Sequence, residues 1–168
     1  MESFLEEKAA KKGINFVFIG AVIFGLAAVG VAIWLLSFRP SMEEQTALIL
    51  AGSFHEGSPE YADLNKDIII STDNDTVQSP TGLGTISMFI KGKIRNKGNR
   101  TITALEVNVA VVTQFNEVLR QRKILVVPVQ QSQLGPDETI PITLTLDGFS
   151  RDDDRANIRW KVTAIKAN

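Results

Sequence analysis

The feature that most constrains this chain is an uncharged apolar run over residues 14–38, close to the N-terminus. Only Asn15 and Ser37 in this run are clearly polar. At about 1.5 Å per residue, a helix of this length exceeds the roughly 30 Å hydrocarbon core of a bilayer. A cleaved signal peptide has a shorter apolar region, on the order of 7 to 15 residues. We therefore expect a transmembrane helix rather than a signal peptide or a buried helix of a soluble protein.

Positive charge is distributed unequally around this run, and Lys and Arg near a span are retained on the cytoplasmic side. Three lysines precede the run and one arginine follows it, namely Lys8, Lys11, Lys12 and Arg39. Trp34 and Phe38 lie at the far end of the run. We expect this end at the outer membrane interface, because aromatic rings are favoured there. We expect a cytoplasmic tail over residues 1–13, a span of the lipid bilayer over residues 14–38, and a C-terminal domain outside the cytoplasm.

Small residues recur on one face of the predicted span. They lie at intervals of four, three and four residues, at Ala21, Gly25, Ala28 and Ala32. Small side chains let a second helix approach closely, which favours association where lipid supplies no hydrophobic drive. The stripe indicates a helix-docking face, although glycine and alanine are common in any membrane helix.

The composition excludes several classes of partner and of catalytic or metal site. The 168 residues carry a formal net charge of -1, so no excess of positive charge points to nucleic acid as a partner. The chain has no cysteine, one histidine and one tyrosine, which removes disulfides, thiolate catalysis and most metal sites. We expect no enzyme activity, no cofactor and no metal. A domain without disulfides outside the cytoplasm fits the bacterial envelope, which places the anchor in the inner membrane.

Residues 39–65 join the span to the rest of the chain. Ser41 and Glu44 have the spacing of a capping box, so a short juxtamembrane helix is expected there. Residues 53–65 show no clear periodicity and are interpreted as a linker. The folded domain is predicted over residues 66–168.

Beyond the linker the hydrophobic period changes to two, the repeat of a strand with one buried face. Four such faces are Ile86, Met88, Ile90, Gly92 and Ile94; Leu105, Val107, Val109 and Val111; Ile140, Ile142, Leu144 and Leu146; and Ile158, Trp160, Val162 and Ala164. Weaker strands are expected over residues 68–72 and 119–129, the latter at an edge because Pro128 cannot donate to a ladder. Ile102 is out of phase with the second face, which predicts a bulge near Thr103.

Turn residues separate these strands. Residues 96–99, 114–117 and 134–137 contain Asn or Gly, which accept positive φ, and Pro136 fixes φ in the third turn. Short strands with turns at this spacing, and no helical segment between them, predict an all-β antiparallel sandwich.

The turn motifs carry a family resemblance. Their residues are Gly92 and Asn96, then Phe115 and Asn116, then Gly135 and Pro136. Over residues 67–166 the chain resembles the FxLYD-type domains of bacterial envelope proteins, although Phe-Asn stands where Tyr-Asp is typical. The resemblance implies an immunoglobulin-like sandwich that serves as an extracytoplasmic interaction module, with no family active site.

Two polar clusters are candidates for cation or metal binding. Asp152, Asp153 and Asp154 form the densest acidic run. Carboxylates can bind Ca²⁺, but consecutive residues seldom converge on one ion, so a solvated turn is the preferred interpretation. His55 has Glu56 nearby and is interpreted as an exposed linker histidine rather than a metal ligand.

For the aromatic and basic residues of the strands, a structural role is again preferred to a binding role. Trp160 lies between two basic residues, but its phase with Ile158 assigns it to the core. Arg120, Arg122 and Lys123 are interpreted as charges that protect an edge strand.

Two functions fit these features. The first is a non-catalytic accessory subunit or assembly factor of a larger membrane complex, for example respiratory or photosynthetic, whose partners are the other subunits. The second is a stand-alone envelope module that binds a peptide, glycan or solute through loops near residues 72–84 and 148–157.

Overall fold

The protein, seen here as a computed structural model, is described over residues 16–37 and 41–168. It divides into two units, Met1–Ser41 and Met42–Asn168. The second unit is called the β-domain below. The predicted topology residues Lys8, Lys11, Lys12, Phe38 and Arg39 lie outside the described residues.

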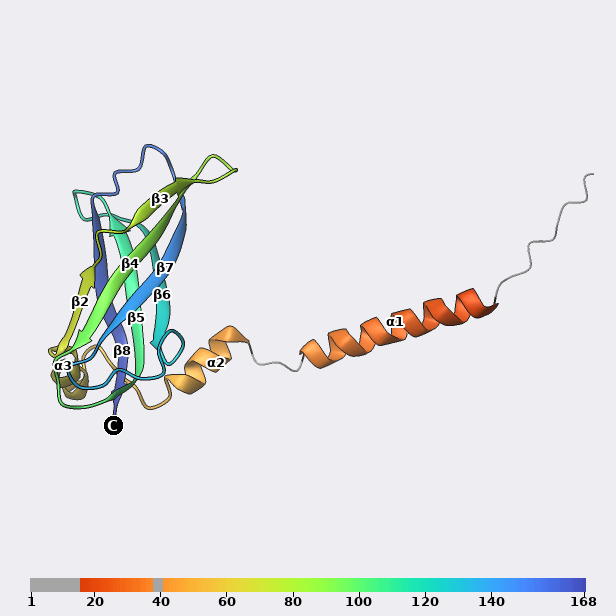
Figure 1. Ribbon diagram of the computed structural model, residues 1–168, viewed down its shortest axis with the longest axis horizontal. Coiled ribbons are helices and arrows are strands. Elements are labelled where there is room, and N and C mark those ends of the chain that lie inside the picture. Colours follow the sequence, from red (N-terminus) through yellow and green to blue (C-terminus); the bar gives the residue numbers. More distant parts are fainter. Residues whose placement is uncertain (1–15, 38–40) are drawn as a thin grey trace, which may run out of the picture. The chain divides into compact units, whose positions relative to one another are not determined.

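The first unit contains helix α1, Phe16–Ser37, whose residues are all exposed (Figure 1). The helix contains neither proline nor charged residues, so nothing interrupts its backbone hydrogen bonds. By length and composition, α1 is able to cross a membrane. The apolar N-terminal helix that the sequence predicts is therefore present, and Trp34 lies near its end.

The β-domain begins with three short elements: α2, Met42–Ile49; β1, Phe54–His55; and α3, Pro59–Asn65. In α3 the Ser58 hydroxyl accepts a hydrogen bond from the Tyr61 amide at 3.2 Å, and Pro59 occupies the first turn. Both features favour a helix start. A short helix follows residue 41, as expected, whereas residues 59–65, which were expected to belong to a linker, form a helix.

The helix α3 belongs to the folded domain because it fills one end of the core. Its Tyr61 and Leu64 are only 7% and 3% exposed and belong to the main hydrophobic cluster. Burying an apolar side chain of this size contributes about 1.5–3 kcal/mol. The domain boundary predicted at residue 66 therefore falls too late in the chain.

The remaining strands form two antiparallel sheets (Figure 1). The strands are β2, Ile68–Thr72; β3, Val77–Pro80; β4, Ile86–Asn96; β5, Ile102–Val112; β6, Val118–Val127; β7, Thr139–Phe149; and β8, Asn157–Ala167. One sheet has the order β1-β8-β5-β6. In the other, β4 pairs with β7 along one edge and with β2 and β3 along the other.

The inward faces of both sheets share one core, and they are largely those expected from the period-two pattern. Ile90 and Ile94 of β4 and Val107 and Val109 of β5 are all fully buried. Trp160 is only partly buried, although it packs against this cluster. The all-β antiparallel architecture is therefore confirmed.

Two irregularities shape the edges of the sheets. The pairing of β5 with β8 shifts register between Ile102 and Ala104, which confirms the predicted bulge. On the side of β4 opposite β7, residues 73–76 separate β2 from β3, which pair with opposite ends of β4. The sequence did not predict β3, because all four of its residues are exposed and its apolar pattern is weak.

Candidate functional site

The predicted helix-docking residues Ala21, Gly25, Ala28 and Ala32 all lie on α1 and are exposed. A Cβ added at Gly25 would meet no atom within 4 Å among the described residues. Among the described residues no atom fills the space beside Gly25, and the role of this face as a docking face stays a prediction.

Two turn motifs that lie far apart in the sequence meet at Asn96. This side chain is only 1% exposed, and its Nδ2 lies 2.8 Å from the Arg100 carbonyl oxygen and 3.0 Å from that of Gly135. Its Oδ1 accepts from the Gly98 amide at 2.9 Å. Asn96 therefore ties the turn after β4 to the turn before β7, which makes it a structural residue.

The other motif residues have different roles from one another. Gly92 lies inside β4 and not in a turn, while Asn116 adopts a positive φ of 68°. In the third turn, Asp137 rather than Gly135 adopts the positive φ, and Pro136 is exposed. The Glu138 carboxylate accepts from the Gly135 amide at 2.6 Å, a contact that sequence reasoning missed.

The basic residues on β6 close the seam between the two sheets. Arg120 Nη2 donates to the Gly148 carbonyl oxygen at 2.6 Å, and Arg122 Nη1 reaches that of Thr145 at 3.4 Å. Gln130 bonds both backbone groups of Thr143, at 3.0 and 3.1 Å. These side chains occupy hydrogen-bonding groups on the free edge of β7, whereas the sequence led us to expect charges that protect the edge of their own strand, β6.

The acidic run also has structural partners. Asp153 accepts from the Ser150 amide at 2.7 Å, and Asp154 accepts from the Gln114 amide at 2.9 Å. His55 is exposed in β1, with Nδ1 3.2 Å from the Thr163 carbonyl oxygen. Across residues 16–37 and 41–168, no group of three His, Cys, Asp or Glu side chains could hold a metal ion.

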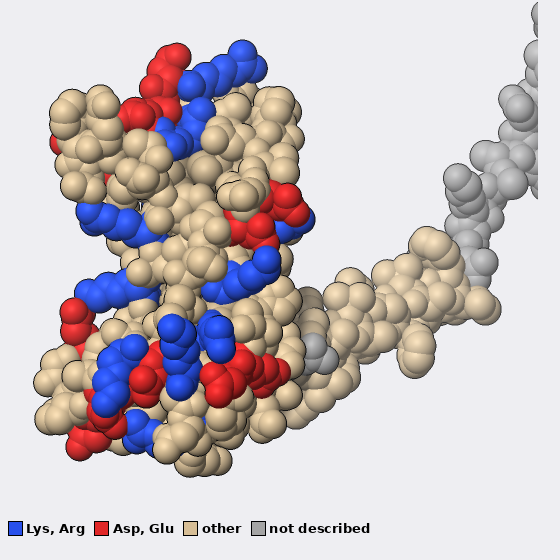
Figure 2. Space-filling view, turned by 60° about the vertical axis from the view of Figure 1, so that its left-hand side comes forward, with Lys and Arg blue, Asp and Glu red and all other residues tan. Residues whose placement is uncertain are grey.

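Ion pairs lie along the outer face of β4. Lys93 lies 3.1 Å from Asp73, and Arg95 lies 3.4 Å from Asp137. A hydrogen bond from Lys93 lowers the pKa of Asp73. Figure 2 shows basic and acidic side chains intermingled on the face that it displays, rather than a field of one sign.

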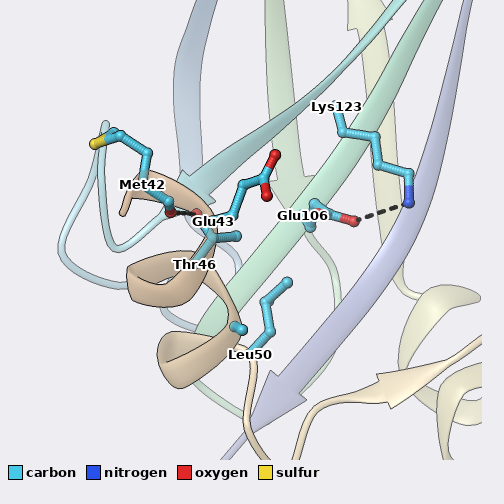
Figure 3. Close-up of a pocket in the computed structure, with 7 residues that line it drawn as sticks. Met42, Glu43, Thr46, Leu50, Glu106 and Lys123 are labelled. Atoms are coloured by element: carbon cyan, nitrogen blue, oxygen red, sulfur yellow. Dashed lines mark hydrogen bonds and ion pairs between the residues drawn. The ribbon is translucent and has the colours of Figure 1, made fainter. Parts of the chain in front are cut away.

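One hollow lies between α2 and the outer face of the β5–β6 pair (Figure 3). Its volume is about 530 Å³, and its lining residues are Met42, Glu43, Thr46, Ala47, Leu50, Glu106 and Lys123. Every residue of α2 stays at least partly exposed. The helix therefore stands over the sheet without sealing the space beneath it.

The hollow contains more negative than positive side chains. The Glu106 side chain is only 13% exposed; its carboxylate accepts from the Thr163 hydroxyl and lies 3.8 Å from Lys123 Nζ. Figure 3 shows Glu43 of α2 extending toward the same region. Two carboxylates thus face one ammonium group in a lining that is otherwise mainly apolar.

A second hollow of about 330 Å³ shares Met42, Thr46 and Lys123 with the first and continues past β6 to Thr143 and Leu144 of β7. Two apolar side chains in its lining are strongly exposed, Met42 by 78% and Val129 by 68%. We call the two hollows together the α2 groove. Exposed apolar side chains gathered in one groove are typical of an interaction surface.

A third, more polar hollow lies at the end of the β-domain remote from α2. It measures about 340 Å³ and is lined by Thr72, Thr76, Gln78, Met88, Arg155, Ala156, Asn157 and Ile158. Its position follows from the register, because Asn157 pairs with Val112 at one end of β5 and Glu106 lies toward the other end. We call this hollow the end notch. It brings together the two loops that the sequence singled out for ligand capture.

Comparison with known proteins identifies no family for the chain. No protein-family model matches it, and no curated protein matches it in sequence. A solved structure described as ApaA from Bordetella pertussis is 16% identical over 60% of this chain and 91% of that chain, with a TM-score of 0.37. The trimeric lipoprotein SadB of Salmonella enterica is 15% identical over 90% of this chain and 84% of its own, with a TM-score of 0.33.

Proposed function

We propose that this protein is a non-catalytic, single-pass accessory subunit or assembly factor of a larger bacterial membrane complex. In this proposal α1 spans the inner membrane with its N-terminus in the cytoplasm. The stripe around Gly25 packs against another transmembrane helix, and the β-domain contacts a neighbouring subunit outside the cytoplasm. Respiratory and photosynthetic complexes are examples of assemblies that use such subunits.

The α2 groove is the observation that carries this proposal. It lies beside a helix that begins at Met42, directly after the segment that follows α1. The described residues leave its wall incomplete, because Met42 and Val129 stay largely exposed. A protein segment seated there would bury these side chains, and each removal of about 100 Å² of apolar surface from water stabilises a complex by roughly 2.5 kcal/mol before the costs of association.

The charge of the groove indicates the chemistry of its occupant. Glu43 and Glu106 outnumber Lys123, so a basic side chain on the partner would find a carboxylate to pair with. The occupant we propose is an apolar polypeptide segment of a neighbouring subunit that carries a lysine or arginine. Complementary charge of this kind fixes orientation and partner choice more than it adds affinity.

We also propose that the β-domain is an immunoglobulin-like sandwich of the FxLYD type. Two observations support this: the two antiparallel sheets share one core, and Asn96 joins the turn motifs on which the resemblance rests. This part of the proposal concerns the fold and assigns no active site.

Affinity purification of the intact protein in mild detergent tests the accessory-subunit proposal directly. We expect defined membrane proteins to co-purify in fixed stoichiometry. Migration of the detergent-solubilised protein as a lone monomer would contradict the proposal and favour a stand-alone tethered module. In that case a soluble fragment would retain all activity. A fragment over residues 42–168 covers the whole second unit, including α3, which completes the core.

Two matched pairs of variants locate the contacts. Gly25→Leu should release the protein from its complex while membrane insertion stays intact, because the bulkier side chain blocks close helix approach. Gly30→Leu is the control, since it makes the same change about 140° away around the helix. In the groove, Ala47→Lys adds bulk and positive charge to the lining, whereas Leu48→Lys makes a like change at a residue that does not line it. Equal co-purification for both members of a pair would remove that contact from the proposal.

A further inference from the structure

The end notch is formed by an interruption in a sheet edge. Thr72 at the end of β2 pairs with Gly92, and Val77 at the start of β3 pairs with Phe89. Residues 73–76 leave the edge between them, and the start of β8 faces the gap with Asn157 and Ile158. The apolar floor of the notch is made by Met88, which is buried, and Ile158, which is half-buried.

The guanidinium group of Arg155 places a positive charge in this notch. Its Nε donates to Gln78 Oε1 at 3.0 Å and its Nη1 donates to the Ser150 carbonyl oxygen at 2.6 Å, so the guanidinium is held in place by neutral acceptors. It also lies 6.0 Å from the centre of the Phe149 ring. Within the described residues no carboxylate forms an ion pair with Arg155, and its Nη2 has no hydrogen-bond acceptor.

The nearby acids are engaged elsewhere. Asp73 pairs with Lys93, and Asp75 lies 3.9 Å from Lys91 on the outer face of β4. Asp153 and Asp154 accept backbone amide protons. None of these carboxylates, and not that of Asp152, forms an ion pair with Arg155 among the described residues.

The rest of the lining supplies hydrogen-bond donors. Thr72 Oγ1 accepts from Trp160 Nε1 at 2.8 Å, which leaves the hydroxyl proton of Thr72 available. Gln78 uses its oxygen on Arg155, which leaves its amide protons available, and Asn157 contributes a further amide. Among the lining residues described by the structure, Arg155 is the charged one and none is acidic.

We propose that the end notch binds a carboxylate group attached to a small apolar body, either as a free organic acid or as an acidic side chain of a peptide. The guanidinium nitrogen Nη2 and the free donors of Gln78 and Thr72 hold the carboxylate oxygens. Charge-assisted bonds of this kind are shorter and stronger than neutral ones. The apolar part of the ligand rests on Met88 and Ile158. The site is separate from the α2 groove and does not depend on the accessory-subunit proposal.

Titration of the full-length protein in mild detergent, followed by calorimetry and ligand-observed NMR, tests this assignment. The probes are benzoate, as a free acid, and N-acetylglutamate α-amide, as an acidic side chain. Benzamide and N-acetylglutamine α-amide are their neutral counterparts. We expect at least one acid to bind about tenfold or more tightly than its neutral counterpart, and the better acid identifies the source of the carboxylate. Equal binding of acid and amide, or no binding of either acid, overturns the proposal.

Substitutions then assign the binding to the notch. Arg155→Gln should weaken acid binding about tenfold or more, while Arg151→Gln, a neighbouring exposed arginine, should leave it unchanged. Asn157→Asp keeps the size of its side chain and adds a negative charge to the lining, so it should abolish acid binding even if Arg155→Gln fails to fold. Unchanged acid binding in a folded Asn157→Asp variant excludes the notch as the site. Co-purification of partners by the same variants reports separately on the accessory-subunit proposal.

Discussion

The indole Nε1 of Trp160 in β8 donates a hydrogen bond to the hydroxyl of Thr72 at the end of β2, 2.8 Å away. The two residues belong to different sheets, so this bond crosses the seam between them. The same ring lies over Gly92 of β4, where an added Cβ would meet Trp160 Cζ2 at 3.0 Å and the Ser71 carbonyl oxygen at 2.8 Å. A side chain at position 92 would therefore push the seam open.

Replacing Gly92 by alanine should destabilise the β-domain by about 1–3 kcal/mol, the usual cost of overpacking a core. Urea denaturation of a soluble fragment over residues 42–168, monitored by tryptophan fluorescence, measures this change. Gly82→Ala is the control, since a Cβ there meets no described atom within 4 Å, and its effect should stay within about 0.5 kcal/mol. Equal stability of the two variants would contradict the packing argument.

Asn96→Asp should destabilise the same fragment by about 2–4 kcal/mol. The substitution replaces an amide that donates to carbonyl oxygens of Arg100 and Gly135 by a carboxylate that repels them, and it leaves buried acceptors without donors. Thermal unfolding at neutral pH measures the loss. Asn99→Asp makes the same chemical change at an exposed site three residues away and should unfold like the parent fragment.

Tyr61 should ionise at higher pH than a free phenol. Burial raises its pKa, and the nearby Glu56 carboxylate raises it further. Because Tyr61 is the one tyrosine of the chain, the absorbance of tyrosinate during alkaline titration reports on it alone. A normal titration midpoint in the folded fragment would rule out this environment.

The raised pKa of Tyr61 also predicts a pH dependence of stability. Its contribution is fully present below the unfolded-state pKa of about 10 and is lost as the pH rises through the folded-state value, since the unfolded chain releases the proton first. Tyr61→Phe removes this dependence along with the 2.7 Å hydrogen bond to the Val162 carbonyl oxygen. The difference in unfolding free energy between the two proteins should therefore shrink above pH 10.

Gln130→Ala should expose the edge of β7. Gln130 bonds both the amide and the carbonyl of Thr143, so its loss frees these groups at a cost of about 0.5–1.5 kcal/mol. Hydrogen exchange at the Thr143 amide should become faster, and concentration-dependent self-association should increase. Gln131→Ala, a neighbouring exposed position, should change neither measurement.

Local patterns in the sequence predicted several elements well. The strands β4, β5, β7 and β8 follow from alternation of apolar residues, and the bulge after Ile102 follows from a break in that alternation. The helix α3 was missed even though Ser58 and Pro59 form a helix-start signal, because its seven residues are too few to show a helical period. The packing of Tyr61 against β8 joins residues far apart in the chain, so no local pattern in the sequence predicts it.

The sequence by itself determined the apolar helix α1, the inward faces of the main strands and the turns, because each depends on residues that are neighbours in the chain. Only the tertiary structure decided which residues of different elements lie together in a groove or notch. Arg155 and Gln78 are 77 positions apart, yet they form one wall of the end notch, and Glu106 faces α2 across the α2 groove. Strand order and register set such meetings, and hydrophobic periodicity reports which face of a strand is buried but not which strand lies opposite.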